Sequence, residues 1–238
     1  MELIKDKWLI QDREDYYSYL NGLSKKDKIE WTRSIVNTNM EVLAIPVPLL
    51  KSIGKEIMKG NYVSFLDLKL LDNYESTMVY GSIINNLKDI ELVKYYLDIF
   101  VNYVDNWSSC DVLSINVKDK DKLFNIGMDY TYSNKPFIRR VGFRILFMYV
   151  DNIENLDKIF ERCNEFYDEE HYYVNMMIAW LLCEAFIKNR DYTLKYLENS
   201  NLNDFVINKT ISKCRDSFRV SKEDKDLLFK YKRKICQK

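Results

Sequence analysis

Apolar residues recur at three- and four-residue steps along most of the chain. The spacing is clearest in the segment 90–104, whose apolar positions are Leu92, Val93, Tyr96, Leu97, Phe100, Val101 and Val104. Such spacing places the side chains on one face of an α-helix and predicts a helix over this segment. No segment alternates apolar and polar residues next to a hairpin turn, so the pattern gives little support to β-strands.

Capping and breaking residues divide the rest of the chain into further helices. Asn73 and Asp89 are suited to cap helices through their side-chain oxygens, and Ser24 is another candidate cap. Pro46 and Pro48 suit the first turn of a helix, where the missing N–H is not needed. The predicted helices cover residues 12–20, 25–37, 46–58, 64–71, 74–87, 90–104, 107–116, 118–130, 135–149, 153–167, 172–188, 191–197, 204–211 and 221–235.

The number of helices and their short connections predict an all-α fold. Antiparallel helix pairs stacked side by side would form a curved solenoid, and we expect residues 1–238 to form a single domain. Hydrophobic residues make up 47% of the chain, with only 6 Gly and 3 Pro, a composition that favours helices over sheets and long loops.

Positive and negative charges balance overall but are unevenly distributed. The chain has 36 Lys and Arg and 36 Asp and Glu. Between Ile207 and Lys238, eleven basic residues face four acids, a net charge of +7, whereas between Asp151 and Glu170 eight acids face two bases, a net charge of −6. A basic surface is what a phosphate backbone needs, although solvated helix faces explain the asymmetry equally well.

The cysteines and the apolar segments exclude several classes of protein. The five cysteines are widely spaced, and because no C-x-x-C pair occurs, neither a disulfide framework nor a zinc site is indicated. We expect no metal and no cofactor. The start of the sequence lacks the apolar core of a secretory signal, and no run of apolar residues is long enough to span a bilayer. We therefore expect a cytoplasmic protein without membrane contact, and a monomer by default.

One stretch stands out as candidate chemistry. Trp107 and Asp111 lie four residues apart, which places an aromatic face beside a carboxylate on one side of a predicted helix over 107–116. Asp105 or Asn106 could accept hydrogen bonds from the free N–H groups of the first turn. The same spacing also arises by chance, since a Trp is usually part of a core and an Asp near a helix start usually serves that helix.

Four stretches together resemble the AlkD-type bacterial DNA alkylation repair glycosylases, which are built from HEAT-like helical repeats. They are IPVPLLK, DNWSSCD, KPFIRR and YVNMMIAWLL, at residues 45–51, 105–111, 135–140 and 173–182. Their order and approximate spacing agree with that family. The chain departs from the usual pattern at Leu49 and Leu50, where an Arg commonly follows the proline, at Phe137, where a Trp is frequent, and at Asn175 and Met176, where Gln and Lys are usual.

The resemblance implies a right-handed HEAT-like solenoid that acts on double-stranded DNA carrying alkylated bases in the bacterial cytosol or nucleoid. It implies that Asp111, Trp107 and Trp180 are catalytic and that Arg140 holds a backbone phosphate. We add Arg139, Arg144, Lys213 and Arg219 as expected DNA contacts, since they lie on the same helix as Arg140 or in the basic C-terminal segment. The expected reaction is hydrolysis of the N-glycosidic bond of purines alkylated at N3 or N7.

Each of these residues also has a purely structural interpretation. Trp180 lies in an apolar segment and by itself is more typical of a core, while Arg140 could pair with Asp151 or Glu154. Cys110 is more plausible as a small packing residue than as a nucleophile. The alternative function is a helical-repeat module that binds nucleic acid or protein without catalysis.

Overall fold

The computed structural model describes residues 1–234 and confirms the all-α prediction. Within this range no β-strand forms, and a single isolated bridge joins Glu41 to Asn73. None of the helices in the same range combines the length and the apolarity that a membrane span requires. The chain divides into two compact units, Met1–Ile126 and Gly127–Lys238, and the boundary falls inside helix α8.

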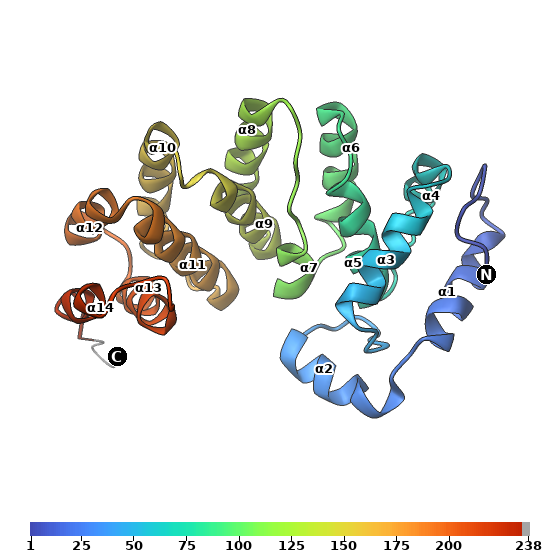
Figure 1. Cartoon of the computed structure of the whole chain (residues 1–238), viewed down its shortest axis with the longest axis horizontal. Coiled ribbons are helices and arrows are strands. Elements are labelled where there is room, and N and C mark those ends of the chain that lie inside the picture. The colour runs from blue at the N-terminus through green and yellow to red at the C-terminus, as the bar shows by residue number, and fades with distance from the viewer. Residues whose placement is uncertain (235–238) are drawn as a thin grey trace. The chain divides into compact units, whose positions relative to one another are not determined.

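The first unit is built around helix α5, which Figure 1 shows among its neighbours. All eleven residues of α5 are buried, so its sequence is apolar or uncharged on nearly every side instead of amphipathic. Helices α3, α6 and α7 pack against it. The elements of this unit are α1 Asp12–Gly22, a 3₁₀ turn Lys26–Lys28, α2 Ile29–Val36, α3 Val47–Ile57, α4 Tyr62–Asp67, α5 Tyr74–Ile84, α6 Ile90–Phe100, α7 Trp107–Asp111 and the start of α8 Lys120–Thr131.

The second unit is built around helix α11, which packs against α9, α12 and α13. Its buried residues include Val174, Met177, Ile178, Leu181 and Leu182, which form an apolar core along most of the helix. The elements of this unit are the end of α8, α9 Pro136–Leu146, a 3₁₀ turn Phe147–Tyr149, α10 Ile153–Asn164, α11 Tyr172–Lys188, α12 Arg190–Asn199, α13 Asp204–Asp216 and α14 Lys222–Phe229.

Several helix boundaries follow the sequence signals and others do not. Asn73 and Asp89 cap α5 and α6 as predicted, each accepting a hydrogen bond from a backbone N–H of the first turn. The prediction for Ser24 is wrong, because its hydroxyl donates to the Leu43 carbonyl at 2.8 Å instead. Helix α13 extends beyond the predicted range 204–211, and α14 ends at Phe229; residue 235, the predicted end of that helix, lies outside the described residues.

A buried carboxylate shapes the entry to α3. Glu75 is fully buried, and its oxygens accept hydrogen bonds from the backbone N–H groups of Leu43 and Ile45 at 3.0 and 3.4 Å. Between these two residues Ala44 adopts a left-handed conformation with φ 58°. Burial raises the pKa of Glu75, and the surrounding N–H groups oppose that rise. Glu75 therefore fixes the strained turn from which α3 begins.

Candidate functional site

Helix α7 rests on the buried helix α5 through hydroxyl contacts. The Ser108 hydroxyl lies 2.8 Å from the Tyr74 hydroxyl, and the Ser109 hydroxyl lies 2.7 Å from that of Thr77. Asn106 caps the helix, since its side-chain oxygen accepts from the backbone N–H of Ser109 at 2.8 Å. The sequence left Asp105 and Asn106 as alternative caps, and the structure selects Asn106.

The helix is shorter than the predicted range 107–116, because a side chain from α5 takes over the backbone beyond it. Asn85, at the C-terminal end of α5, donates to the Val112 carbonyl at 2.8 Å and accepts from the Ser114 N–H at 2.6 Å. Val112 keeps helical dihedral angles as the C-cap, and these two contacts direct the chain away from the helix after it. Trp107 and Asp111 are therefore the first and last residues of a single short helix.

The orientation of Trp107 is set by the end of α2, and the segment that follows α2 is held beside it. Its indole N–H donates to the Ile35 carbonyl at 3.0 Å, close to the C-terminal end of α2. Asp105 holds the same segment, since it accepts from the Thr38 hydroxyl and from the Asn39 backbone N–H. Asp105 therefore has a structural role, and the partly exposed indole ring of Trp107 is fixed at its N–H edge.

Asp111 lies one turn beyond Trp107 on the same side of α7, as the four-residue spacing predicted. Both side chains are partly exposed, whereas the neighbouring residues Ser109 and Cys110 are buried. The burial of Cys110 fits the packing role expected from the sequence. In the first unit, the structure therefore presents one carboxylate and one indole together at the surface.

The cap of α7 carries a stability prediction. Asn106 is fully buried and also donates to the Asp105 carboxylate and the Ser109 hydroxyl at 3.1 Å, so Asn106→Ala removes three hydrogen bonds and takes the side-chain acceptor from the buried Ser109 N–H. We expect a loss of about 2 to 3 kcal/mol in the free energy of unfolding, measured by urea denaturation. The matched control is Asn152→Ala, which removes the cap of α10 at an exposed site and should cost about 1 kcal/mol. An equal or smaller loss for Asn106→Ala would contradict this description of the cap.

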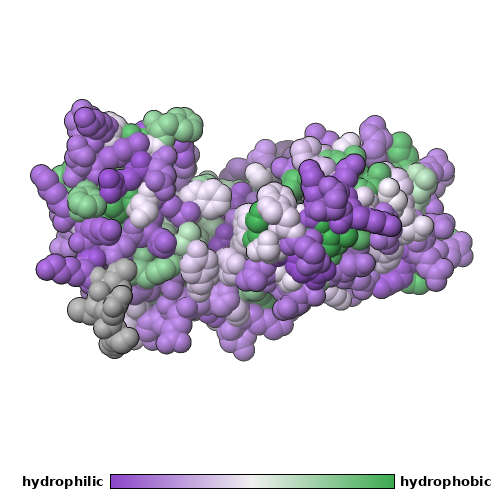
Figure 2. All heavy atoms as spheres, turned by 90° about the horizontal axis from the view of Figure 1, so that it is seen from below, coloured by the Kyte–Doolittle hydropathy of each residue, from purple (hydrophilic) through white to green (hydrophobic). Residues whose placement is uncertain are grey.

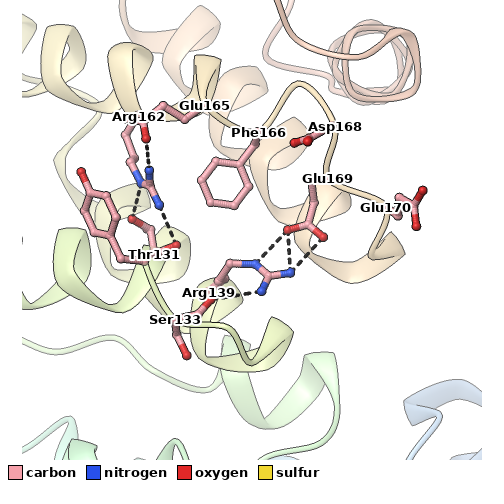
Figure 3. A pocket seen from close by; sticks show the side chains of 10 residues that line it. Thr131, Ser133, Arg139, Arg162, Glu165, Phe166, Asp168, Glu169 and Glu170 are labelled. Carbon is pink, nitrogen blue, oxygen red and sulfur yellow. Dashed lines mark hydrogen bonds and ion pairs between the residues drawn. The ribbon is translucent and has the colours of Figure 1, made fainter.

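In the second unit, two arginines of α9 are engaged by protein acceptors. Arg139 pairs with Glu169 through both nitrogens of its fork, at 2.7 to 3.0 Å, and also donates to the carbonyls of Ser133 and Asn134. Ser133, Arg139 and Glu169 line an open pocket of about 620 Å³. Figure 3 shows Arg139 directed at Glu169, and Arg162 directed at Thr131 and Glu165 in the same pocket. Arg140 is only 4% exposed and donates to the Tyr173 carbonyl of α11.

Trp180 is at the surface and belongs to a cluster of rings and cations. It is 40% exposed, so the core interpretation suggested by its apolar neighbours in sequence is wrong. The Lys213 ammonium lies 5.4 Å from the centre of its ring, and the Phe147 ring lies 5.5 Å away on another side. Arg144 in turn lies over the Phe147 ring at 5.4 Å. The predicted residues Arg144, Trp180 and Lys213 thus form one surface cluster with Phe147.

Arg219 is held close to the same helix face. It forms two hydrogen bonds with the Glu184 carboxylate, at 2.9 and 2.6 Å. Glu184 lies four residues after Trp180 on α11, so the two side chains are one helical turn apart on the same side. Lys213 and Arg219 therefore contact neighbouring positions of α11.

A family model described as "DNA alkylation repair enzyme" matches residues 18–214, which is most of the chain. The chain belongs to this family. A search of curated proteins found no match.

Membership of the DNA alkylation repair enzyme family places the chain among enzymes of DNA repair, and DNA is the molecule on which such enzymes act. The matched region contains both units' candidate residues, Trp107 and Asp111 in the first and Arg140 and Trp180 in the second. Arg219 lies beyond its end. Within residues 1–234 no group of three or more His, Cys, Asp or Glu is arranged to hold a metal ion.

In this member of the DNA alkylation repair enzyme family, the sequence did not reveal which side chains contact Trp180, Arg139 and Arg219. Phe147 carried no motif, and its contact with Trp180 depends on the packing of α9 against α11. In the sequence, Glu169 is one of the acids of segment 151–170, and no motif marks Glu184. A useful signal would have been the sequence separation, since Glu169 lies 30 residues after Arg139 and Glu184 lies 35 residues before Arg219. Such separations correspond to about one pair of helices.

Proposed function

We propose that the protein is a DNA glycosylase that hydrolyses the N-glycosidic bond of purines alkylated at N3 or N7 in double-stranded DNA. The observation that carries the proposal is the pairing of a partly exposed Asp111 with Trp107, whose indole edge is fixed by the Ile35 carbonyl. Family membership supports DNA repair as the setting. The exposed Trp180, flanked by Lys213, supports a contact with nucleic acid in the second unit.

The proposed reaction needs a carboxylate, Asp111, but no general acid. A purine alkylated at N3 or N7 is already cationic, so it departs as a neutral base when the bond to C1′ breaks. The deoxyribose then develops positive charge, which a nearby carboxylate stabilises. Asp111 would supply that negative charge and orient the water whose oxygen bonds to C1′, and a proton from this water passes to the carboxylate or to solvent.

The aromatic and cationic residues would hold the substrate. The face of Trp107 would contact the deoxyribose and the cationic base, with a cation–π contact of about 0.5 to 2 kcal/mol. Trp180 would contact the duplex from the second unit. Arg144 and Lys213 would contact backbone phosphates from the cluster around Trp180. Arg140 is only 4% exposed and donates to the Tyr173 carbonyl, so it would reach a phosphate only after its side chain changes conformation.

The experiment that tests the proposal is release of free base from duplex DNA. We expect the protein to release 7-methylguanine from a duplex that contains it, and to leave a duplex containing uracil intact, because uracil is a neutral base and needs protonation to depart. Chromatography of the released base measures both. Release of uracil at a similar rate, or no release of 7-methylguanine, would contradict the proposed mechanism.

A second candidate is a module that binds nucleic acid without catalysis. The observation that favours it is the surface cluster of Arg144, Trp180 and Lys213, which could contact nucleic acid without the Asp111 carboxylate. This alternative predicts equal affinity for plain and damaged duplexes, a steep dependence on salt and no turnover.

A further inference from the structure

Phe218 projects into solvent to an unusual extent. It is 96% exposed, more than any other large hydrophobic side chain in residues 1–234. The next most exposed are Ile10 and Trp31, at 69% and 66%. Figure 2 shows one face of the molecule, which is largely hydrophilic with smaller apolar areas. Exposing an apolar ring to water gains nothing for folding.

The turn that carries Phe218 is anchored on both sides. Before it, the Ser217 N–H donates to the Lys213 carbonyl at 3.1 Å and ends helix α13. After it, the Arg219 guanidinium is held by Glu184, and Val220 is buried. The Arg219 N–H also donates to the Ser217 hydroxyl at 3.2 Å. The ring therefore extends from a fixed turn.

This turn is attached next to Trp180. Lys213 covers one side of the Trp180 ring, and four residues further along α11 Glu184 holds Arg219, the neighbour of Phe218. The two contacts tie the end of α13 and the turn after it along one side of α11. The turn that carries Phe218 is thus attached to α11 at Glu184, one helical turn along that helix from Trp180 and within the same unit.

The charge around the turn is positive. Between residues 213 and 222 four bases face one acid, Asp216. Arg215 and Lys222 are exposed, and Arg215 also lies over the Phe229 ring at 4.7 Å. An apolar ring that projects from a cationic surface suits a partner that has both negative charges and apolar groups. Duplex DNA has both, because its stacked bases lie between its phosphates.

We propose that Phe218 is a wedge residue that inserts between base pairs of duplex DNA where the stack is weakened, while Lys213, Arg215 and Lys222 contact the flanking phosphates. The inference rests on the proposed function, because it assumes that DNA with a damaged base is the substrate. The wedge would hold the duplex in a distorted form beside Trp180. It adds a positioning residue that lies beyond the region matched by the family model.

The test is binding to a duplex that contains a tetrahydrofuran abasic analogue, with 2-aminopurine beside it. This probe has no base to release, so binding is measured apart from catalysis, and 2-aminopurine fluorescence rises when its stacking is lost. We expect wild type to bind and to raise the fluorescence. Phe218→Ala should bind about tenfold more weakly, as expected for the loss of one aromatic contact with a base, and should not raise the fluorescence. Phe218→Trp should restore both.

Two matched variants separate the wedge from a general surface effect. Tyr167→Ala removes another exposed aromatic side chain of the same unit, but from the acidic segment 151–170, and should leave both readouts unchanged. Lys222→Ala should reduce the slope of log affinity against log salt by about one, whereas Phe218→Ala should leave that slope unchanged because it removes no charge.

The outcomes distinguish the two proposals. If wild type binds the abasic duplex and Phe218→Ala matches it in affinity and fluorescence, the wedge is refuted and the glycosylase proposal stands. If wild type fails to bind damaged or plain duplex, both are refuted. If Phe218→Ala reduces binding only to vesicles containing phosphatidylglycerol, the exposed ring serves a membrane surface and the wedge is refuted. Because Phe218 makes no core contact, folding of the variant should be unaffected.

Discussion

Replacing Asp111 by Asn should lower the single-turnover rate of 7-methylguanine release by about a hundredfold to a thousandfold. The amide keeps the size of the side chain but removes the negative charge that would stabilise the cationic sugar. Affinity for undamaged duplex should change little, because removing a negative charge costs no contact with phosphate. The rate is measured with enzyme in excess over a labelled duplex, so that binding and product release do not limit it.

The control for this result is Asp98→Asn. Asp98 is a surface carboxylate of the same unit that pairs with Lys94 on α6, and its loss should leave the rate of base release unchanged. Equal rates for wild type and Asp111→Asn would show that the carboxylate does not take part in the reaction. Equal losses in Asp111→Asn and Asp98→Asn would point to a general effect of charge.

Gly142→Ala should be the most destabilising small substitution in the second unit. A Cβ at this position of α9 would lie 2.7 Å from the Gly127 carbonyl oxygen and 2.8 Å from the Thr131 backbone nitrogen, both on α8. Because these are backbone atoms, α8 and α9 must separate to admit the methyl group. We expect a loss of about 3 kcal/mol in the free energy of unfolding, at the upper end for overpacking, measured by urea denaturation.

Gly22→Ala provides the matched control. Gly22 is the last residue of α1, and a Cβ there would meet no atom within 4 Å. The substitution should be neutral or should stabilise the protein by up to about 1 kcal/mol, because alanine restricts the unfolded chain. A similar small effect at Gly142 would show that α8 and α9 are not in close contact.

The sequence predicted helices well where local chemistry decides their ends. Asn73, Asp89 and Asn106 cap helices because a side-chain oxygen close in sequence reaches free N–H groups, and the pattern alone contains that information. The predictions for the Ser24 cap and for the end of α7 are wrong because groups distant in sequence form the hydrogen bonds there. The Leu43 carbonyl takes the Ser24 hydroxyl, and the Asn85 side chain takes the backbone after Asp111.

For the candidate site too, the features set by local sequence were predictable and those set by tertiary packing were not. The four-residue spacing placed Trp107 and Asp111 on one side of a helix, which the structure confirms for the first unit. The surface position of Trp180 was not predictable from its apolar neighbours, because the side of α11 that faces solvent depends on how α9 and α13 cover it. The ion pairs of Arg139 and Arg219 likewise depend on tertiary packing, and they weaken the case for these two as free phosphate contacts.

The most direct test of the central claim counts molecules of free 7-methylguanine released from duplex DNA by wild type and by Asp111→Asn, beside a blank without protein. The proposed mechanism predicts release well above the blank for wild type and release close to the blank for Asp111→Asn. Release at the level of the blank by wild type, or equal release by the two proteins, would contradict it.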